Sequence, residues 1–437
     1  MSNVARAMPN KYCMHMVTDA QSAGGAEQAM FGTKIMALAD RLAQWSEVPD
    51  GLTCTYLSPA HCSVAAEIRD LMRQAGLTAD IDAIANVVGR HAADDPRAPA
   101  LILASHYDTV RNAGKYDGRL GVLVALVVAE HLRRLGRKLP FHLDVIAFSE
   151  EEGVRFASSF LGSSAVAGRF DPSLLERRDA EGITLAAAMG AAGLDRAGIP
   201  ALARPGKELA GYLEVHIEQG PVLLEEGLPV GIVSAIAGTV RCMVTISGTA
   251  GHAGTVPMGR RHDAAAAAAE FVLYVEQRCA QAPTLVGTVG QLAVPNGAIN
   301  IIPGRCELTL DIRAADDATR DAAVRDVMRE IGRIAEKRGV VIESREVQRT
   351  AAVRCSPRLQ SLLSDAVTRA GVDPRHLPSG AGHDAMMFDG VTDTAMLFVR
   401  CGNGGVSHSP LEIITAEDAD VAARVVLDTV LRLAKAS

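Results

Sequence analysis

The sequence lacks the cysteine pattern of a protein stabilised by disulfide bonds and the long apolar run of a membrane-spanning protein. None of its eight cysteines forms a C-x-x-C pair, and scattered cysteines in a chain of 437 residues are typical of reduced thiols rather than of a disulfide framework. The longest apolar run, residues 120–129, is far shorter than the roughly 20 residues that a membrane span needs, and residues 1–19 contain no apolar signal core. We therefore expect a soluble, cytoplasmic protein without a membrane partner.

Missing motifs exclude several common chemistries and architectures. There is no Walker A sequence, no G-x-S-x-G elbow, no H-E-x-x-H helix and no G-x-G-x-x-G after a strand. No period of roughly 20 to 50 residues indicates a repeat array. Acidic residues (51) and basic residues (44) are interspersed and give a net charge of −7, which argues against a nucleic-acid-binding surface.

The composition of the chain is that of an ordinary globular protein, and the chain is longer than one hydrophobic core usually serves. With 48% hydrophobic and 22% charged residues among 437, two domains are expected. Apolar periodicity predicts helices over residues 32–46 and 58–76, strands over residues 81–90 and 141–148, and a strand that begins at residue 211 and ends near His216. Polar clusters follow several of the predicted strands. This recurrence is typical of an open α/β sheet, whose ligands lie beyond the carboxyl ends of its strands.

The pattern changes after residue 238. The order strand, helix, two strands, helix, strand over residues 239–349 is that of a ferredoxin-like split βαβ unit. Helices and strands then alternate again towards the C-terminus. We therefore expect an α+β domain, residues 239–349, inserted into a discontinuous α/β domain of residues 1–238 and 350–437.

Residues 101–132 contain the densest group of candidate functional residues. A short apolar strand, residues 101–104, is followed by His106, Asp108 and Asp117, and then by an apolar helix from residue 120. An H-x-D sequence at a strand end can direct an imidazole into a crevice while the carboxylate holds its other nitrogen. An aspartate at the start of the next helix can bridge two cations. This arrangement predicts half of a metal site.

Further candidate ligands follow other predicted strands. One apolar strand runs directly into Glu150, Glu151 and Glu152, which is unfavourable unless a cation or a function holds these charges together. His216 and His408 also lie near predicted strand ends. Each of these residues alone is more often an ordinary surface or hydrogen-bonded side chain. Together, imidazoles and carboxylates favour Zn, Mn, Co or Ni over Ca.

The chain resembles a family of metal-dependent amidohydrolases that includes allantoate amidohydrolase, N-carbamoyl-L-amino acid hydrolase and β-ureidopropionase, within the aminoacylase and carboxypeptidase clan. The resemblance extends from about residue 30 to the C-terminus and rests on the ordered motifs SHYDTVRNAGKYDG, FSEEEGVRF, HIEQGPVLLEEG, GTAGHAGTVPMGRR, NIIPG with DIR, SGAGHDA and GGVSHSP. It implies a mixed-sheet, di-metal hydrolase catalytic domain with an inserted ferredoxin-like α+β domain that serves as a dimerisation lid.

The resemblance also implies a pair of metal sites in each subunit. His106, Asp117 and His216 would hold one divalent ion, and Asp117, Glu152 and His408 would hold a second, so that Asp117 bridges two ions of Zn, Mn, Co or Ni.

The remaining carboxylates near these ligands receive roles by the same resemblance. Asp108 would orient His106, and Glu151 would be the general base that activates a water molecule. The residue types alone do not decide which of Glu151 and Glu152 is the base and which is the ligand. Glu150 is interpreted as a solvated residue.

The resemblance implies substrate contacts on both expected domains. His252, Asn300 and Arg313 match positions of the inserted domain that close over the substrate, and Gln219 and Gly382 match contacts on the catalytic domain. Glycines around His252 would let its imidazole approach a developing oxyanion, while Arg313 offers a fork for a carboxylate. We expect Asn300 and Arg313 to face one crevice. In this family the closing histidine commonly comes from the partner subunit, which implies a homodimer.

Three kinds of function remain open. The first is hydrolysis of a ureido or carbamoyl group on a small carboxylate, with allantoate favoured over N-carbamoyl-L-amino acids and β-ureidopropionate. The second is a peptidase or N-acyl deacylase of the same clan, and the third is a catalytically silent metal-binding dimer. Peptidases and N-acyl deacylases of the clan typically carry a carboxylate ligand at the position of His216. The histidine at this position, together with Asn300 and Arg313, favours hydrolysis of a ureido or carbamoyl group. The chain departs from the family by an N-terminal extension of about 30 residues.

Overall fold

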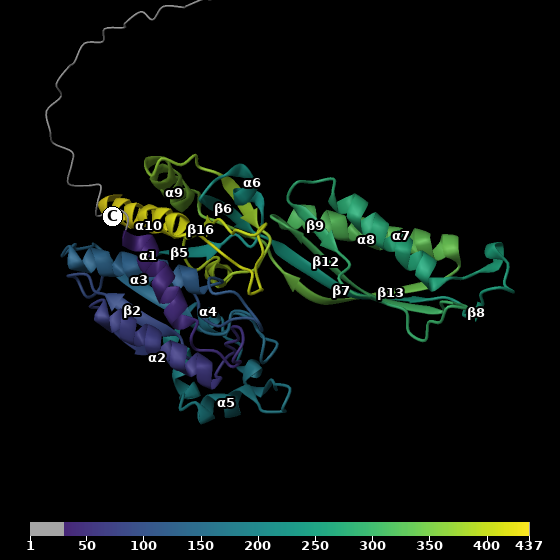
Figure 1. Cartoon of the computed structure of the whole chain (residues 1–437), viewed down its shortest axis with the longest axis horizontal. Coiled ribbons are helices and arrows are strands. Elements are labelled where there is room, and N and C mark those ends of the chain that lie inside the picture. Colours follow the sequence, from purple (N-terminus) through teal and green to yellow (C-terminus); the bar gives the residue numbers. More distant parts are fainter. Residues whose placement is uncertain (1–29, 437) are drawn as a thin grey trace, which may run out of the picture.

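A computed structural model describes residues 30–436, which contain two main sheets with separate hydrophobic cores and a small two-stranded ribbon (Figure 1). The predicted N-terminal extension lies outside the described residues. Within residues 30–436, no helix has both the length and the apolar character needed to cross a membrane. The seven cysteines between Cys54 and Cys401 are free thiols in this part of the chain, as the sequence predicts.

The large sheet has mixed strand directions. Its central strands β4, β3, β5 and β16 are neighbours in that order and all run parallel. Strand β2 pairs antiparallel with β4, and β6 pairs antiparallel with β16 and β14 but parallel with β15. This confirms the predicted mixed α/β class. The strands are β1 (Thr78–Ile81), β2 (Val87–His91), β3 (Ala100–His106), β4 (His142–Phe148), β5 (Leu209–Ile217), β6 (Val230–Ile236), β14 (Val353–Arg354), β15 (His376–Ser379) and β16 (Thr394–Val399).

Both faces of the large sheet are covered because its central strands are apolar throughout. Along β3, Leu101 and Leu103 point into one core, and Ile102 and Ala104 point into the other. Continuous apolar strands of this kind are typical of sheets buried on both sides. The long helices pack on the first face: α1 (Met30–Leu42), α2 (Pro59–Gln74), α3 (Arg119–Arg134), α9 (Pro357–Arg369) and α10 (Ala416–Ala436). The short helices lie elsewhere in the same unit: α4 (Leu161–Val166), α5 (Leu185–Ala191) and α6 (Val222–Glu226).

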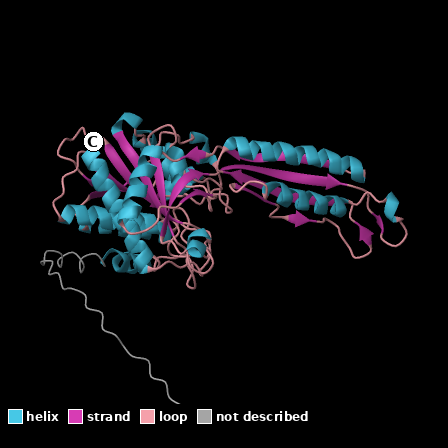
Figure 2. Cartoon of the chain, turned by 90° about the horizontal axis from the view of Figure 1, so that it is seen from above, coloured by secondary structure: helices cyan, strands magenta, loops and turns pink. Residues whose placement is uncertain are grey.

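The small sheet follows β6 in the sequence and is entirely antiparallel. Its strand order is β10, β12, β7, β13, with β9 also paired to β12, which is the order of a ferredoxin-like unit. Helices α7 and α8 cover one of its faces (Figures 1 and 2). The elements are β7 (Gly238–Ser247), α7 (Ala264–Cys279), β9 (Leu285–Thr288), β10 (Leu292–Ala293), β12 (Arg305–Ala314), α8 (Asp317–Arg338) and β13 (Val341–Thr350).

A two-stranded ribbon lies at the far end of the small sheet. It pairs β8 (Gly251–His252) with β11 (Ile301–Ile302), and Figure 1 shows β8 at the end of the molecule most distant from the large sheet. This ribbon was not among the predicted elements.

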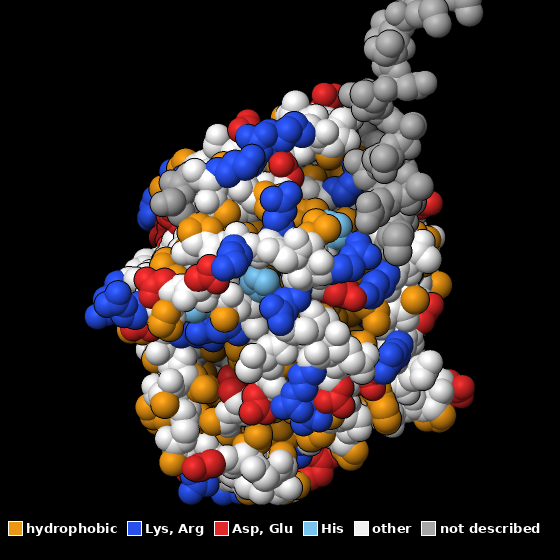
Figure 3. Space-filling view, turned by 90° about the vertical axis from the view of Figure 1, so that its left-hand side faces the viewer, with side chains coloured by type: hydrophobic (Ala, Val, Ile, Leu, Met, Phe, Trp, Pro, Cys, Tyr) orange, Lys and Arg blue, Asp and Glu red, His pale blue; other side chains and the backbone are white. Residues whose placement is uncertain are grey.

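On the face of the molecule in Figure 3, acidic side chains lie beside basic ones, as the interspersed charges of the sequence predict.

The predicted strand over residues 81–90 is wrong in its first half. Strand β1 ends at Ile81, a turn follows, and β2 begins at Val87. The carboxylate of Asp82 accepts hydrogen bonds from the backbone N–H groups of Ile84 and Asn86, at 3.0 and 2.9 Å. Such side-chain to backbone bonds stabilise a turn over an extended conformation.

Candidate functional site

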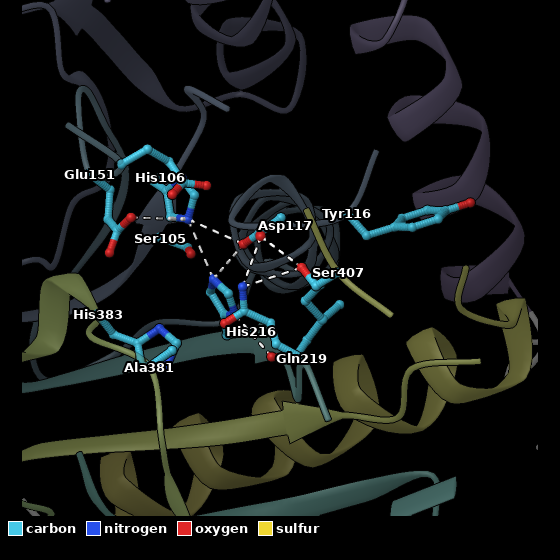
Figure 4. A network of polar contacts seen from close by, with 12 residues as sticks. Ser105, His106, Tyr116, Asp117, Glu151, His216, Gln219, Ala381, His383 and Ser407 are labelled. Carbon is cyan, nitrogen blue, oxygen red and sulfur yellow. Dashed lines mark hydrogen bonds and ion pairs between the residues drawn. The ribbon is translucent and has the colours of Figure 1, made fainter. Parts of the chain in front are cut away.

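The predicted metal-binding residues converge because four neighbouring strands end at the same edge of the large sheet. His106 ends β3 and His216 lies at the end of β5, while the loop after β4 carries Glu152 and the loop after β16 carries His408. Asp117 precedes α3, directly after the loop from β3. Ligands of parallel sheets lie at this carboxyl edge, and Figure 4 shows His106, Asp117 and His216 pointing toward one another there.

The two oxygens of Asp117 face two different groups of side chains. Its Oδ1 lies 3.1 Å from His216 Nε2 and 3.6 Å from His106 Nε2, and those two imidazole nitrogens are 3.4 Å apart. Its Oδ2 lies 3.1 Å from Nε2 of His408, which is 3.7 Å from Oε1 of Glu152. Within each group, the ligand atoms all lie within 4.8 Å of one another. This is the geometry of a carboxylate placed between two binding positions.

The acidic and basic members of this cluster shift one another's pKa. Burial lowers the pKa of His106, but hydrogen bonds with Asp108 and Asp117 outweigh burial and raise it well above its ordinary value. The hydrogen bond with Asp117 raises the pKa of His408 to about 9. Burial, reinforced by the charge of Asp117, raises the pKa of Glu152 to about 7. The cluster therefore favours added positive charge, which either protons or a cation can supply.

Asp108 connects the ends of β3 and β4. Its Oδ1 lies 3.4 Å from Nδ1 of His106, so the other imidazole nitrogen is directed to Asp117. The same carboxylate accepts hydrogen bonds from the backbone N–H groups of Glu151 and Glu152, at 3.0 and 3.1 Å. A carboxylate behind a histidine ligand fixes its ring orientation. The contact with His106 is the one that the sequence predicts, and the contacts with the glutamate backbone are additional.

The three consecutive glutamates have different surroundings. The interpretation of Glu150 as solvated is wrong, because its side chain is completely buried and neither carboxylate oxygen has a hydrogen-bond partner among the described residues. Its backbone has a positive φ of 52°, so the chain turns sharply and carries the side chain inward. Glu151 and Glu152 face the cluster instead, with Glu151 Oε2 4.0 Å from His106 Nε2.

A glycine allows His106 and the start of α3 to approach closely. Gly118 has a φ of 64°, a conformation that glycine adopts without strain. A Cβ atom at this position would lie 2.4 Å from the imidazole ring of His106. The absence of a side chain at position 118 therefore leaves the space that the His106 ring occupies.

A cavity of about 280 Å³ opens beside the cluster. The predicted substrate contacts Gln219, Gly382 and Arg313 line it together with the cluster residues. Gln219 Nε2 donates to Oδ2 of Asp117 at 2.9 Å and lies 3.2 Å from His408 Nε2. Three of the predicted contacts therefore surround one space, although they come from distant parts of the sequence.

His252 and Asn300 do not reach this cavity within their own chain. They lie together at the ribbon of β8 and β11, where the N–H of Ala253 donates to the carbonyl of Asn300 at 2.9 Å. The expectation that Asn300 and Arg313 face one crevice is therefore wrong within a single chain. Strand β12, ten residues long, runs between them, because its first residue is next to the ribbon and Arg313 is near its other end.

Residues that were not predicted also surround the cluster. Glu412 is buried, and its Oε1 accepts hydrogen bonds from the backbone N–H groups of Tyr116 and Asp117, at 2.8 and 3.2 Å. Ser407 lies within hydrogen-bond distance of both Asp117 and Glu412. Arg241 lines the cavity from the small sheet. The period-two pattern of VRCMVTISG places Arg241 on the polar face of its strand, but it does not indicate what that face meets.

The residues of the cluster fit a metal centre. Three imidazoles and two carboxylates are a donor set that suits Zn, Mn, Co or Ni. Oε1 of Glu152 is buried and accepts no hydrogen bond in the described part of the chain, although it belongs to the group with Asp117 and His408. A buried oxygen without a donor is costly unless another ligand satisfies it. The cluster is therefore a candidate metal site on structural grounds alone.

Comparison with known proteins places the chain in a family. Residues 102–432 match the family model described as peptidase family M20/M25/M40. An N-carbamoyl-L-amino acid amidohydrolase of Geobacillus stearothermophilus is 42% identical over 368 residues, which cover 84% of this chain and 90% of that protein. An allantoate deiminase of Arabidopsis thaliana is 38% identical over 432 residues, which cover 92% of this chain and 82% of that protein.

A solved structure agrees with these sequence matches. An amidase of the hydantoinase/carbamoylase family from Burkholderia multivorans superposes with a TM-score of 0.87 at 31% identity, over 92% of this chain and 98% of that one. The chain therefore belongs to peptidase family M20/M25/M40, a family of metal-dependent hydrolases.

Proposed function

We propose that the protein is a metal-dependent hydrolase that cleaves the ureido or carbamoyl C–N bond of a small carboxylate, with allantoate as the favoured substrate. The observation that carries the proposal is the position of Asp117, whose two oxygens face two groups of nitrogen and oxygen ligands beside a cavity. N-carbamoyl-L-amino acids and β-ureidopropionate are the alternative substrates. The names of the relatives, an N-carbamoyl-L-amino acid amidohydrolase and an allantoate deiminase, support this class of bond.

Two divalent cations per subunit are part of the proposal. His106, Asp117 and His216 would hold one, and Asp117, Glu152 and His408 would hold the other. When bound, such ions polarise a carbonyl group and lower the pKa of a water molecule towards about 7. The residues would accept Zn, Mn, Co or Ni.

Glu151 is the proposed general base. It faces the cavity and belongs to neither of the two groups around Asp117, although its carboxylate also lies within ligand distance of His106 and Glu152. With His106 and Glu152 assigned to the two cations, the Glu151 carboxylate remains to accept a proton. Burial, reinforced by the charges of Glu152 and Asp384, raises the pKa of Glu151 well above its ordinary value. A carboxylate with a raised pKa can take a proton from a nucleophilic water and pass it to the leaving nitrogen, a role worth typically about 10²- to 10⁴-fold in rate.

Arg313, Gln219 and Gly382 are the proposed substrate contacts of the same chain. Asp311 holds Nε and one N–H of Nη2 of Arg313, and Gly380 accepts one N–H of Nη1, so the second N–H of each terminal nitrogen can donate to a substrate carboxylate. Gln219 lies next to the proposed metal ligands. Gly382 is close to the ring of Phe160, since a Cβ atom there would lie 3.0 Å from it. The absence of a side chain at position 382 keeps this wall of the cavity open.

His252 and Asn300 are proposed to act on the cavity of a partner subunit in a homodimer. Neither residue lines the cavity of its own chain, and Figure 1 shows β8 of their ribbon at the end of the molecule most distant from the large sheet, which supports this arrangement. Met258 and Ile299 are almost fully exposed near this ribbon, and exposed apolar side chains often mark an interaction surface. Residues 239–349 would then be the dimerisation domain, between the two parts of the catalytic domain, residues 1–238 and 350–437.

The test is a screen for product release by the purified, metal-reconstituted protein. The substrates are allantoate, ureidoglycolate, N-carbamoyl-L-amino acids, β-ureidopropionate, N-acetyl amino acids and dipeptides, with ammonia or free amine measured. We expect release of ammonia from one or more ureido substrates and no comparable turnover of acetyl or peptide substrates. Turnover confined to peptides or N-acetyl amino acids would contradict the proposal and favour the peptidase or deacylase alternative.

A further inference from the structure

The open face of the small sheet carries a row of polar side chains that reaches the cavity. Strand alternation turns Val240 and Cys242 of β7 towards the helices and leaves Arg241 on the open face. Arg241 lies directly opposite Asp311 of β12 on one side and Gln348 of β13 on the other. Three adjacent strands therefore place these side chains in one line across the sheet.

Hydrogen bonds fix the guanidinium groups on this face. Asp311 accepts from Nε and Nη2 of Arg313, at 2.9 and 3.0 Å, and from Nε of Arg241 at 2.8 Å. Arg241 Nη1 donates to Oε1 of Gln348 at 2.9 Å, and Arg313 Nη1 donates to the carbonyl of Gly380 at 2.8 Å. Burial raises the pKa of Asp311, but the two arginines outweigh burial and lower it. Asp311 is therefore a charged bridge that holds both arginines.

This wall of the cavity retains a positive charge and unused donors. Two guanidinium groups share one carboxylate, and both line the cavity whose other wall contains His106, Asp117 and Glu151. Among the described residues, Nη2 of Arg241 makes no hydrogen bond, and the Arg241 side chain is 44% exposed whereas that of Asp311 is 25% exposed. Arg241 can therefore donate to a ligand without breaking its contacts with Asp311 and Gln348.

We propose that Arg241 is a second substrate-binding residue, which donates to an acceptor oxygen on the side arm of the substrate while Arg313 binds the main carboxylate. The proposal rests on the proposed function, because the metal side of the cavity must hold the scissile ureido group. The side arm would carry a carbonyl or carboxylate oxygen, such as a second ureido group or an acidic side chain. Asp311 acts as a positioning residue, since it sets the separation of the two guanidinium groups.

This arrangement predicts a preference among substrates of the same reaction. A substrate whose side arm ends in an oxygen acceptor gains a charge-assisted hydrogen bond from Arg241, worth about 10- to 100-fold in binding. A substrate with a short alkyl arm gains nothing from Arg241. Arg241 should therefore raise kcat/KM for substrates with an acceptor on the side arm, but not for substrates with an alkyl arm. The rate of the chemical step should not change.

The test compares Arg241→Met with Arg305→Met. Arg305 of β12 is a matched control because it lies on the same open face of the small sheet as Arg241 and also pairs with an acidic residue, Glu307, at 2.9 Å. Unlike Arg241, it does not line the cavity. The values of kcat and KM are measured for wild type and both variants on an acceptor-arm pair, allantoate and N-carbamoyl-L-aspartate, and on N-carbamoyl-L-alanine. Circular dichroism and metal content establish that each variant is folded and loaded, and Arg241→Lys is included as the milder change.

We expect Arg241→Met to lower kcat/KM about 10- to 100-fold on the acceptor-arm substrates, mainly through KM, and less than about threefold on N-carbamoyl-L-alanine. Arg305→Met should match the wild type on all three. Equal losses on both substrate classes, or no loss on either, would overturn the role of Arg241 and leave the proposed function intact. A wild type that turns over no ureido substrate would overturn both proposals. If Arg241→Met does not fold, the same ratios measured for Arg241→Lys decide the question.

Discussion

The backbone N–H of Glu151 donates a hydrogen bond to Oδ1 of Asp108 at 3.0 Å, which ties the loop after β4 to the end of β3. The next N–H, that of Glu152, donates to Oδ2 of the same carboxylate at 3.1 Å. Because both backbone groups are held by one rigid acceptor, the two glutamate side chains leave the chain at fixed positions. Glu151 then lies beside His106, and Glu152 lies beside His408.

This arrangement predicts different outcomes for neighbouring substitutions. Glu151→Gln should keep both metal ions and lower kcat by roughly 10²-fold or more, because only a proton acceptor is lost. Glu152→Gln should weaken one metal position, since its carboxylate faces His408 and Asp117. Metal content after dialysis, measured together with kcat, distinguishes the two. The opposite pattern would exchange the roles of the two glutamates.

Gly118 provides a test of how precisely His106 must lie. Gly118→Ala places a Cβ atom 2.4 Å from the imidazole ring, so the ring must move, and we expect metal affinity to fall about 10- to 100-fold. Gly136→Ala is the matched control, because Gly136 also has a positive φ of 60° but no atom within 4 Å of an added Cβ. In both variants, alanine must adopt a positive φ, which lowers the free energy of unfolding by a similar amount, roughly 1 kcal/mol. Equal metal affinity in the two, from titration of the metal-free proteins, would rule out the steric effect on His106.

The burial of His61, which is not a proposed metal ligand, predicts that the free energy of unfolding depends on pH. It is completely buried between Tyr56 and Tyr107, and burial lowers its pKa to about 3. Above about pH 6.5 the imidazole is neutral in the folded and unfolded states. As the pH falls below this value towards 3, the unfolded chain binds a proton that the folded protein does not bind, so the free energy of unfolding decreases.

His61→Phe removes the titrating group and retains an aromatic ring. Between pH 6.5 and 5, the free energy of unfolding should therefore fall less steeply in the variant than in the wild type, by roughly 1 kcal/mol per pH unit, because the unfolded imidazole is only half protonated at pH 6.5. Urea unfolding of both metal-free proteins at several pH values measures the difference. Identical slopes would mean that His61 takes up its proton without unfolding.

A shared active site predicts recovery of activity on mixing two inactive variants. Glu151→Gln removes the proposed base, and His252→Ala removes the proposed closing residue of the neighbouring subunit. A heterodimer would contain one composite site with both residues intact. We therefore expect turnover to reappear after subunit exchange, measured by product release with heterodimer formation followed by mass spectrometry. Heterodimers that form without activity would indicate that His252 acts on its own chain or not at all.

Much of the fold and of the cluster could be predicted from local sequence patterns. Apolar runs marked β3, β4, β5 and α3, and polar residues directly after these strands indicated which edge of the sheet carries the site. The resemblance of the motifs to metal-dependent amidohydrolases is confirmed by the family match. The cluster is predictable because its residues lie at strand ends or in the loops that follow them, at one edge of the sheet.

The errors and omissions at the candidate site share a physical cause. The interpretation of Glu150 as solvated is wrong because its side chain is buried and its backbone has a left-handed conformation, neither of which a run of three glutamates reveals. Glu412 contacts Asp117, from which it is separated by 295 residues, and Arg241 meets the cavity only through the placement of the small sheet. These contacts are set by long-range packing, so no local pattern could predict them.

The most direct test of the account is the metal dependence of ureido hydrolysis. The active protein should contain about two divalent ions per subunit by elemental analysis, and ammonia release from its best ureido substrate should disappear after chelation. Adding Mn, Co, Ni or Zn to the stripped protein should restore turnover, to different degrees for different metals. Full ureido hydrolysis by a sample shown to be free of metal would contradict the assignment of the Asp117 cluster as the catalytic centre.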